Sequence, residues 1–259
     1  MRWASLVVFV ATVARAQCTP QWHAGFGRNG TDGFVFAATS WDPDGPGPAG
    51  SVLVLGGPFA HAGHVDAPRL VVWDPATGMF APLGGGFDGP LDDVLALPNG
   101  DLVATGAFST AGGVPCANIA RWNGAGWTPF GSGVQGQVHC VARLANGDLV
   151  VGGGFATAGG VPCANVARWN GSAWSPLGGG TDGFVSDLEQ MPNGDVIAAG
   201  AFATADGLPA SGLARWNGAA WSSLGGGVAG IAVNLHVTPV GELLVGGYFT
   251  AAGGVPCDS

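Results

Sequence analysis

Three oxygen-bearing side chains occupy one position of an internal repeat and could bind a ligand together. Asp93, Asp187 and Asn234 are separated by multiples of 47 residues, and Cys140 takes the position between the first two. If the repeats surround one axis, these oxygens could coordinate Ca²⁺, which takes about 6–8 oxygen ligands, or hydrogen-bond a sugar. We predict Ala37 as the equivalent residue of the first repeat. The alternative is that this position only lines a hydrated channel.

The five cysteines are a second reactive set, and their odd number leaves at least one unpaired. Cys116, Cys163 and Cys257 share one repeat position. Equivalent loops on a ring lie farther apart than the roughly 7 Å that a disulfide spans between Cα atoms, so these three should not pair with one another. We predict instead one disulfide from Cys140 to Cys116 or Cys163. The alternative is that all the thiols stay reduced.

No arrangement of residues identifies an enzyme. A glycosidase needs two carboxylates about 5–10 Å apart, and Asp93 with Asp187 is the only pair that the repeat suggests. His61 and His64 could begin a zinc site, but the sequence offers no third ligand beside them. We therefore predict no catalytic residues, no metal site and no cofactor apart from the Ca²⁺ considered above.

The composition is acidic and rich in glycine. The 259 residues include 49 Gly, 18 Pro and no Lys, and the formal net charge is −9. Such a charge opposes binding to nucleic acid or anionic lipid, which require basic surfaces. The 10 Trp and the 47% of hydrophobic residues exclude a solvated disordered chain and favour short strands joined by tight turns.

Residues 1–16 have the features of a secretory signal peptide. Arg2 gives a positive start, the apolar run 6–13 is too short to span a bilayer, and Ala14-Arg15-Ala16 fits a cleavage site. Cleavage would leave residues 17–259 as one secreted or cell-envelope domain, whose partner is a protein or glycan of the cell exterior. We expect a monomer that does not insert into the membrane after cleavage. A retained anchor is the alternative.

An internal repeat determines the expected fold. Asn-Gly-Asp recurs at 99–101, 146–148 and 193–195, and Arg-Trp-Asn-Gly recurs at 121–124, 168–171 and 215–218. In the third repeat we predict strands over Val138–Leu144, Asp148–Phe155, Asn165–Trp169 and Trp174–Leu177. Asn-Gly between apolar runs indicates tight hairpins, because both residues tolerate the positive φ of a primed turn.

A four-stranded sheet of this size cannot bury both of its faces alone, so we expect the repeats to pack radially as blades of a β-propeller. The predicted complete blades are 33–86, 91–133, 138–180 and 184–227, with a partial fifth at 231–259. The fifth is either three-stranded, with Trp22–Gly25 as its outer strand, or the start of a blade in a longer, truncated propeller. A flat solenoid or a sandwich fits the repeat length less well.

Two repeated side chains are expected to be structural rather than ligand-binding. The Arg of each Arg-Trp-Asn-Gly segment can pair with the Asp of the same repeat. These pairs are Arg121 with Asp101, Arg168 with Asp148 and Arg215 with Asp195. The second Trp of each repeat is expected to pack between blades. These residues are Trp127, Trp174 and Trp221.

The order Gly-Asp-Leu-Val-Val-Gly-Gly (147–153), Ala-Arg-Trp-Asn-Gly (167–171) and Trp-Ser-Pro-Leu (174–177) resembles the kelch motif. Residues 71–80 match the usual kelch sequence most closely, and the chain is also similar to Gly-rich repeats of secreted bacterial proteins. The resemblance implies a propeller but no single function, because kelch-like propellers include enzymes, lectins and scaffolds. Tyr248, the single tyrosine, argues against the copper radical oxidases among them.

The predicted function is therefore that of a secreted, non-enzymatic binding or structural propeller of unknown ligand. The alternative is a carbohydrate-binding lectin or a propeller that acts on glycosides. Lectin sites in every blade would repeat one polar and aromatic set, whereas the set repeated here is mostly apolar.

Overall fold

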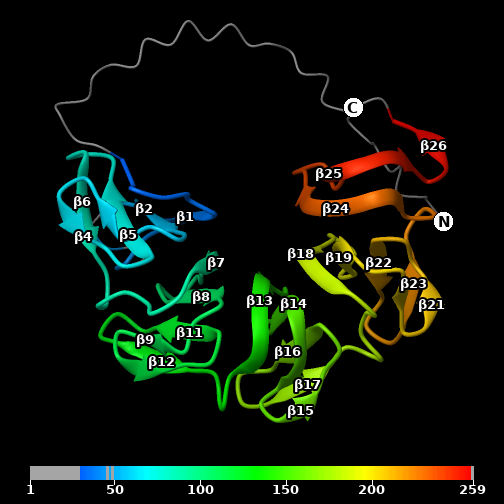
Figure 1. Cartoon of the computed structure of the whole chain (residues 1–259), viewed down its shortest axis with the longest axis horizontal. Coiled ribbons are helices and arrows are strands. Elements are labelled where there is room, and N and C mark those ends of the chain that lie inside the picture. Colours follow the sequence, from blue (N-terminus) through cyan, green and yellow to red (C-terminus); the bar gives the residue numbers. More distant parts are fainter. Residues whose placement is uncertain (1–29, 45–46, 48–49, 258–259) are drawn as a thin grey trace, which may run out of the picture. The chain divides into compact units, whose positions relative to one another are not determined.

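The computed structural model describes residues 30–44, 47 and 50–257, in which every regular element is a β-strand (Figure 1). These residues form two compact units, one up to Val134 and one from Gln135 onward. No helix in this part of the chain is long and apolar enough to cross a membrane. The predicted signal peptide and the segment Trp22–Gly25 lie outside the described residues.

The first unit contains two antiparallel four-stranded sheets, each with a short hairpin. The first sheet has the order β1 (Ala37–Trp41), β2 (Val52–Gly56), β5 (Leu70–Asp74) and β6 (Met79–Pro82), and its hairpin joins β3 (His61–Ala62) to β4 (Val65–Asp66). The second sheet has the order β7 (Leu91–Ala96), β8 (Leu102–Gly106), β11 (Ile119–Trp122) and β12 (Trp127–Pro129), and its hairpin joins β9 (Thr110–Ala111) to β10 (Val114–Pro115).

The second unit contains three further antiparallel sheets. The third sheet has β13 (Val134–Arg143), β14 (Leu149–Ala158), β16 (Val166–Trp169) and β17 (Trp174–Pro176), with β15 (Val161–Pro162) paired to β14. The fourth has β18 (Phe184–Gln190), β19 (Val196–Ala201), β22 (Leu213–Trp216) and β23 (Trp221–Ser223), with the hairpin β20 (Thr204–Ala205) and β21 (Leu208–Pro209). The fifth has β24 (Val228–Val237), β25 (Leu243–Ala252) and β26 (Val255–Pro256).

The all-β, antiparallel part of the predicted fold is confirmed, and the four strands predicted in the third repeat are present. Two of them are longer than predicted, since β13 begins at Val134 and β14 continues to Ala158. The fifth sheet is three-stranded, and its third strand is β26, the counterpart of β15.

The Asn-Gly hairpins form as predicted, but the expected primed turn is wrong. In the loop 123–126 only Gly124 has a positive φ, of 88°. Asn123 instead accepts hydrogen bonds with its side chain, because its Oδ1 lies 3.0 Å from both Ala125 N and Gly126 N. The Asn123 side chain thus accepts the loop's own amide hydrogen bonds, and the chain turns through residues 123–126 instead of through a two-residue primed turn.

Successive sheets within a unit pack face to face through their apolar second strands. All five residues of β8 are buried, and β18 packs against β14 on one side and β24 on the other. Gly152 permits one of these approaches, since a Cβ there would lie 2.6 Å from Val185 Cγ1 and 2.8 Å from Cys140 Sγ. Burial on both sides explains why the second strands are almost continuously apolar.

Candidate functional site

The residues predicted to bind a ligand lie on the first strand of their sheets, just after an irregularity. Register shifts fall between Leu91 and Asp93, between Val185 and Asp187, and between Ala232 and Asn234. Such a bulge inserts one residue and re-aims the side chain that follows it.

The strand register confirms Ala37 as the equivalent of Asp93 in the first sheet. Ala37 pairs with Gly56 and Gly56 with Leu70, just as Asp93 pairs with Thr105 and Thr105 with Ile119. The next residues, Gly57 and Gly106, both donate their amide to the residue before the third strand, which fixes this correspondence.

Asp187 is hydrogen-bonded to the backbone of two sheets. Its Oδ1 accepts from Leu188 N at 2.8 Å, and its Oδ2 accepts from Leu235 N of β24 at 2.6 Å. Burial raises the pKa of Asp187, against these two hydrogen bonds, which lower it. The side chain therefore links the fourth sheet to the fifth.

Glu189 is a further carboxylate on β18 that the sequence reasoning missed. Burial raises the pKa of Glu189, and the nearby Asp187 carboxylate adds to this effect while His236 opposes it. The two acids are two residues apart on a strand, which places them on one face and is the signal that could have found the pair.

Asp93 and Asn234 differ in their surroundings. Asp93 Oδ1 accepts a hydrogen bond from Val94 N at 2.8 Å, and Asn234 is exposed. Within the described ranges, no three His, Cys, Asp or Glu side chains gather in a way that could hold a metal ion. Binding of a ligand or Ca²⁺ at Asp93, Asp187 and Asn234 stays a prediction.

Another set of carboxylates, which we call the acid clamps, binds the loop after the second strand in three sheets. Asp88, before β7, accepts hydrogen bonds at one oxygen from Ser109 N and Thr110 N, both at 2.9 Å, and at the other from the Ser109 hydroxyl. The same backbone arrangement joins Asp32 to Ala60 N and His61 N, and Asp182 to Ala203 N and Thr204 N. The recurrent Asp-Gly ahead of the first strand is the sequence signal for these clamps.

The clamps favour the ionised carboxylate. Burial opposes the ionisation of Asp88, but hydrogen bonds from Ser109 and Thr110 outweigh it and lower the pKa of Asp88 to about 2. A hydrogen bond from the backbone of Thr204 likewise lowers the pKa of Asp182. Each clamp is thus charged at neutral pH and accepts its amide hydrogen bonds at full strength.

The clamp of the first sheet also engages a histidine ring. His61 Nδ1 lies 2.8 Å from Asp32 Oδ2, and its Nε2 lies 3.3 Å from Asp66 Oδ1. The hydrogen bond to Asp32 raises the pKa of His61. Carboxylates thus engage both ring nitrogens, and among the described side chains His61 and His64 gather no further metal ligand.

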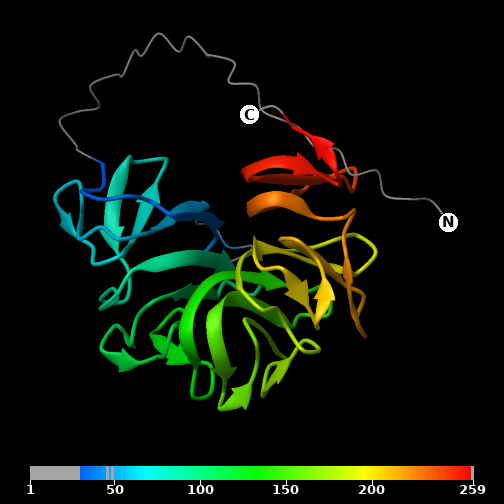
Figure 2. The same ribbon diagram turned by 45° about the vertical axis from the view of Figure 1, so that its right-hand side comes forward.

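Gln135 and Ala229 stand where the third and fifth sheets would carry the clamp. In these two sheets the second strand is not interrupted, and β14 and β25 each run for 10 residues. In the clamped second and fourth sheets, β8 and β19 are only 5 and 6 residues long. Figure 2 shows the long strands of the third sheet, β13 and β14, side by side in green.

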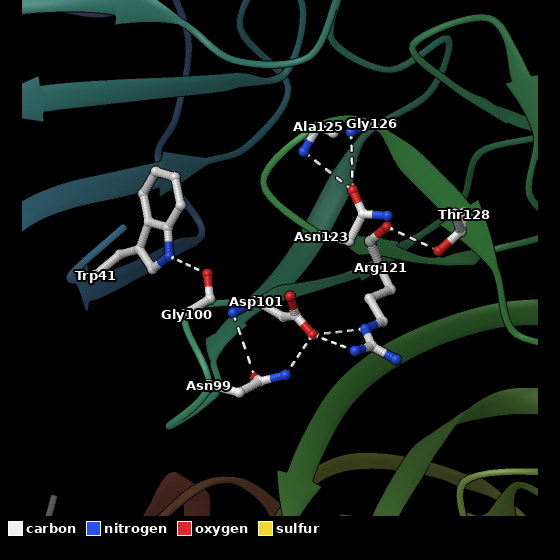
Figure 3. A network of polar contacts seen from close by, with 9 residues as sticks. All are labelled: Trp41, Asn99, Gly100, Asp101, Arg121, Asn123, Ala125, Gly126 and Thr128. Carbon is white, nitrogen blue, oxygen red and sulfur yellow. Dashed lines mark hydrogen bonds and ion pairs between the residues drawn. The ribbon is translucent and has the colours of Figure 1, made fainter. Parts of the chain in front are cut away.

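The predicted Arg–Asp pairs are confirmed in three repeats. Arg121 Nε donates to Asp101 Oδ2 at 2.7 Å, and Asn99 Nδ2 donates to the same oxygen at 2.6 Å (Figure 3). The Asp101 side chain is 9% exposed and that of Arg121 is 46% exposed, so a nearly buried carboxylate pairs with a half-exposed guanidinium. The other two pairs are Arg168 with Asp148 and Arg215 with Asp195.

The indole ring of Trp41 is buried where the first sheet packs against the second. Trp41, the last residue of β1, is buried, and its Nε1 donates to Gly100 O of the second sheet at 2.8 Å (Figure 3). The tryptophans predicted to pack between sheets are also buried, namely Trp127, Trp174 and Trp221.

The structure has Cys116, Cys140, Cys163 and Cys257 as thiols, so the predicted disulfide from Cys140 is not formed in it. Cys140 belongs to the core cluster between the third and fourth sheets, with its Sγ close to Gly152. Cys163 is buried in the loop after β15, where burial raises the pKa of its thiol. The sulfur of Cys140 thus faces the sheet packing and not a loop.

Two hollows in the described part of the second unit are lined without any Asp or Glu. The larger, of about 670 Å³, lies beside Gln135, Phe155 and Cys163. The smaller, of about 310 Å³, lies between the third and fourth sheets and is called here the inter-sheet groove. The polar and aromatic residues of its wall include Asn146, Arg168, Ser175, Gln190 and Trp216.

The fold is shared with extracellular, β-propeller-like domains of sensor proteins. One is the extracellular domain of a protein described as a one-component system from B. thetaiotaomicron, with a TM-score of 0.52 and 8% identity over 82% of this chain and 26% of that chain. Another, from a hybrid two-component system of the same organism, has a TM-score of 0.52 and 12% identity over 82% of this chain and 25% of that one. This chain therefore spans about a quarter of the structures that it resembles. No protein-family model and no curated protein matches the sequence.

Proposed function

We propose that this chain is a non-enzymatic binding or structural module that acts outside the cytoplasm, built as a kelch-like propeller with blades of about 47 residues. Its partner would be a protein or glycan of the cell exterior, and the module would act as a monomer. The signal-peptide features of residues 1–16 and the extracellular origin of the similar domains support this location.

The placement of the carboxylates is the observation that carries the proposal. The recurrent acids are hydrogen-bonded into loops or paired with Arg, and Asp187 joins two sheets. Neither described hollow of the second unit has an acid in its wall. General acid–base chemistry such as glycoside hydrolysis requires carboxyl groups that face one substrate site, whereas binding does not.

Export and turnover test this proposal. When the full chain is produced in a bacterium with an intact secretion pathway, N-terminal sequencing of the exported protein should begin at Gln17. The purified protein should release no reducing ends from glycosides or polysaccharides above the buffer control. Intact Met1 in the cytosol would contradict the location, and hydrolysis that Asp187→Asn abolishes would contradict the absence of catalysis.

A further inference from the structure

The inter-sheet groove corresponds to a place where the first unit carries an indole ring. Trp41 ends β1 and pairs with Val52. Its counterpart in the second unit is Leu144, which directly follows β13 and whose amide donates to Asp148 O at the corresponding place. Trp41 covers Gly100 in the next sheet, and the corresponding glycine of the second unit, Gly194, lines the groove. Leu144 lines the groove, but its side chain has no N–H to donate to Gly194 O as the indole of Trp41 donates to Gly100 O.

One wall of the groove is an aromatic ring held in a fixed position. Trp216 is half-buried, with its ring centroid 5.5 Å from that of Trp221. Its edge lies against the chain at Gly178, where an added Cβ would be 2.9 Å from Trp216 Cζ3. A ring fixed in this way offers a ligand a flat apolar surface with little loss of side-chain entropy.

The remaining wall supplies hydrogen-bonding groups without net charge. Arg168 is 43% exposed and pairs with Asp148, which neutralises the guanidinium and leaves other N–H groups to donate. The exposed amide of Asn146 already donates one N–H to the Asp148 side chain and accepts from the Asp148 backbone, which leaves a second N–H to donate, and Ser175 adds an exposed hydroxyl.

Gln190 connects the two sheets that form the groove. Its Oε1 accepts from Ala145 N of the third sheet at 2.7 Å, and its Nε2 donates to Gly194 O of the fourth at 3.0 Å. These two hydrogen bonds hold the adjacent turns in register, so the width of the groove is set before any ligand arrives.

We propose that the inter-sheet groove binds a sugar unit of a neutral saccharide. The C–H face of a pyranose ring can pack on Trp216, while its hydroxyls can accept from Asn146 and Arg168 and can both donate to and accept from Ser175. An indole or other aromatic ligand would leave most of these polar groups without a hydrogen-bond partner. The formal charge of −9 disfavours an acidic sugar, and about 310 Å³ is at the lower end of the range for small-molecule sites.

This inference rests on the proposed binding function, and a panel of immobilised neutral gluco-, galacto- and manno-oligosaccharides tests it. We expect the wild-type protein to retain at least one member of the panel, with an affinity measured by calorimetry. Ser175→Ala and Asn146→Ala should each weaken binding about three- to tenfold, the effect of one lost hydrogen bond. The matched controls Ser222→Ala and Asn193→Ala change the same positions one repeat later and should bind as the wild type does.

A substitution that fills the groove gives an independent test. Leu144→Trp introduces the indole that the first unit carries at this place and should weaken binding at least tenfold, whereas Arg143→Trp, at the neighbouring position outside the groove wall, should not. Retention of no neutral saccharide, or equal effects of the groove variants and their controls, would overturn the inference. The proposed function would survive either result, because its own test is export without turnover.

Discussion

The second and third sheets are built from closely similar repeats, yet their second strands end differently. In the second sheet Asp88 binds two loop amides, and the strand stops at Gly106 before the short hairpin begins. In the third sheet Gln135 takes that place, and β14 continues to Ala158, where it pairs directly with β15. The two sheets otherwise share the Arg–Asp pair, with its half-exposed guanidinium, and the Asn-Gly hairpins.

The difference shows that one acceptor can decide how far a strand extends. Every backbone amide in such a loop needs a partner, and a carboxylate that offers one oxygen to two consecutive amides competes with the ladder. When that carboxylate is absent, the neighbouring strands provide the partners instead. The larger hollow of the second unit lies beside Gln135, at the unclamped loop.

Removing the feature that the two sheets share should have the largest effect. Asp101→Ala and Asp148→Ala should each lower the free energy of unfolding by about 2–3 kcal/mol, because the substitution leaves Arg and Asn donors without their acceptor. Urea unfolding followed by tryptophan fluorescence measures both values. If the two losses of unfolding free energy differ by more than a factor of two, the Arg–Asp pairs of the two sheets do not contribute equally to stability, despite their similar geometry.

Removing the feature that differs should separate the two sheets. Asp88→Ala should lower the free energy of unfolding by about 1–2 kcal/mol, since two amides and a hydroxyl lose their acceptor. Gln135→Ala should change it by less than about 0.5 kcal/mol, as is usual for an exposed side chain outside such a network. Similar losses for both variants in the same urea titration would refute the assigned role of the clamp.

The strands and the Arg–Asp pairs were predictable because the repeat displays them several times. Asn-Gly between apolar runs located the hairpins, and an Arg and an Asp recurring at fixed positions indicated the ion pair. The clamps recur as well, as Asp-Gly ahead of the first strand, but only in three of five repeats. Their partners are backbone amides, which leave no mark on the sequence.

The missed features depend on packing that local pattern does not encode. The bulge before Asp93 inserts a residue that no residue type indicates. The inter-sheet groove depends on whether the end of the first strand carries a large buried indole, as at Trp41, or a smaller half-buried side chain, as at Leu144. That difference becomes visible only when two sheets are in contact.

A smaller effect should appear in the acid range. The pKa of Asp88 is about 2 in the folded protein and about 4 in an unfolded chain, so the clamp contributes stability above pH 4 that is lost as the pH falls towards 2. The difference in urea midpoint between the wild type and Asp88→Asn should therefore shrink between pH 4 and pH 2. A difference that is constant over this range would mean that the charge of Asp88 is not what the loop requires.

Amide hydrogen exchange tests most directly the claim that the carboxylate, rather than the strand ladder, holds the loop of the second sheet. In Asp88→Ala the amides of Ser109 and Thr110 should exchange about tenfold faster than in the wild type, as expected for about 1.4 kcal/mol of lost protection. In Gln135→Ala the amides of Ala156 and Thr157 should exchange at the wild-type rate, because they lie within β14. Unchanged exchange at Ser109 and Thr110, or equal acceleration in both variants, would contradict the account.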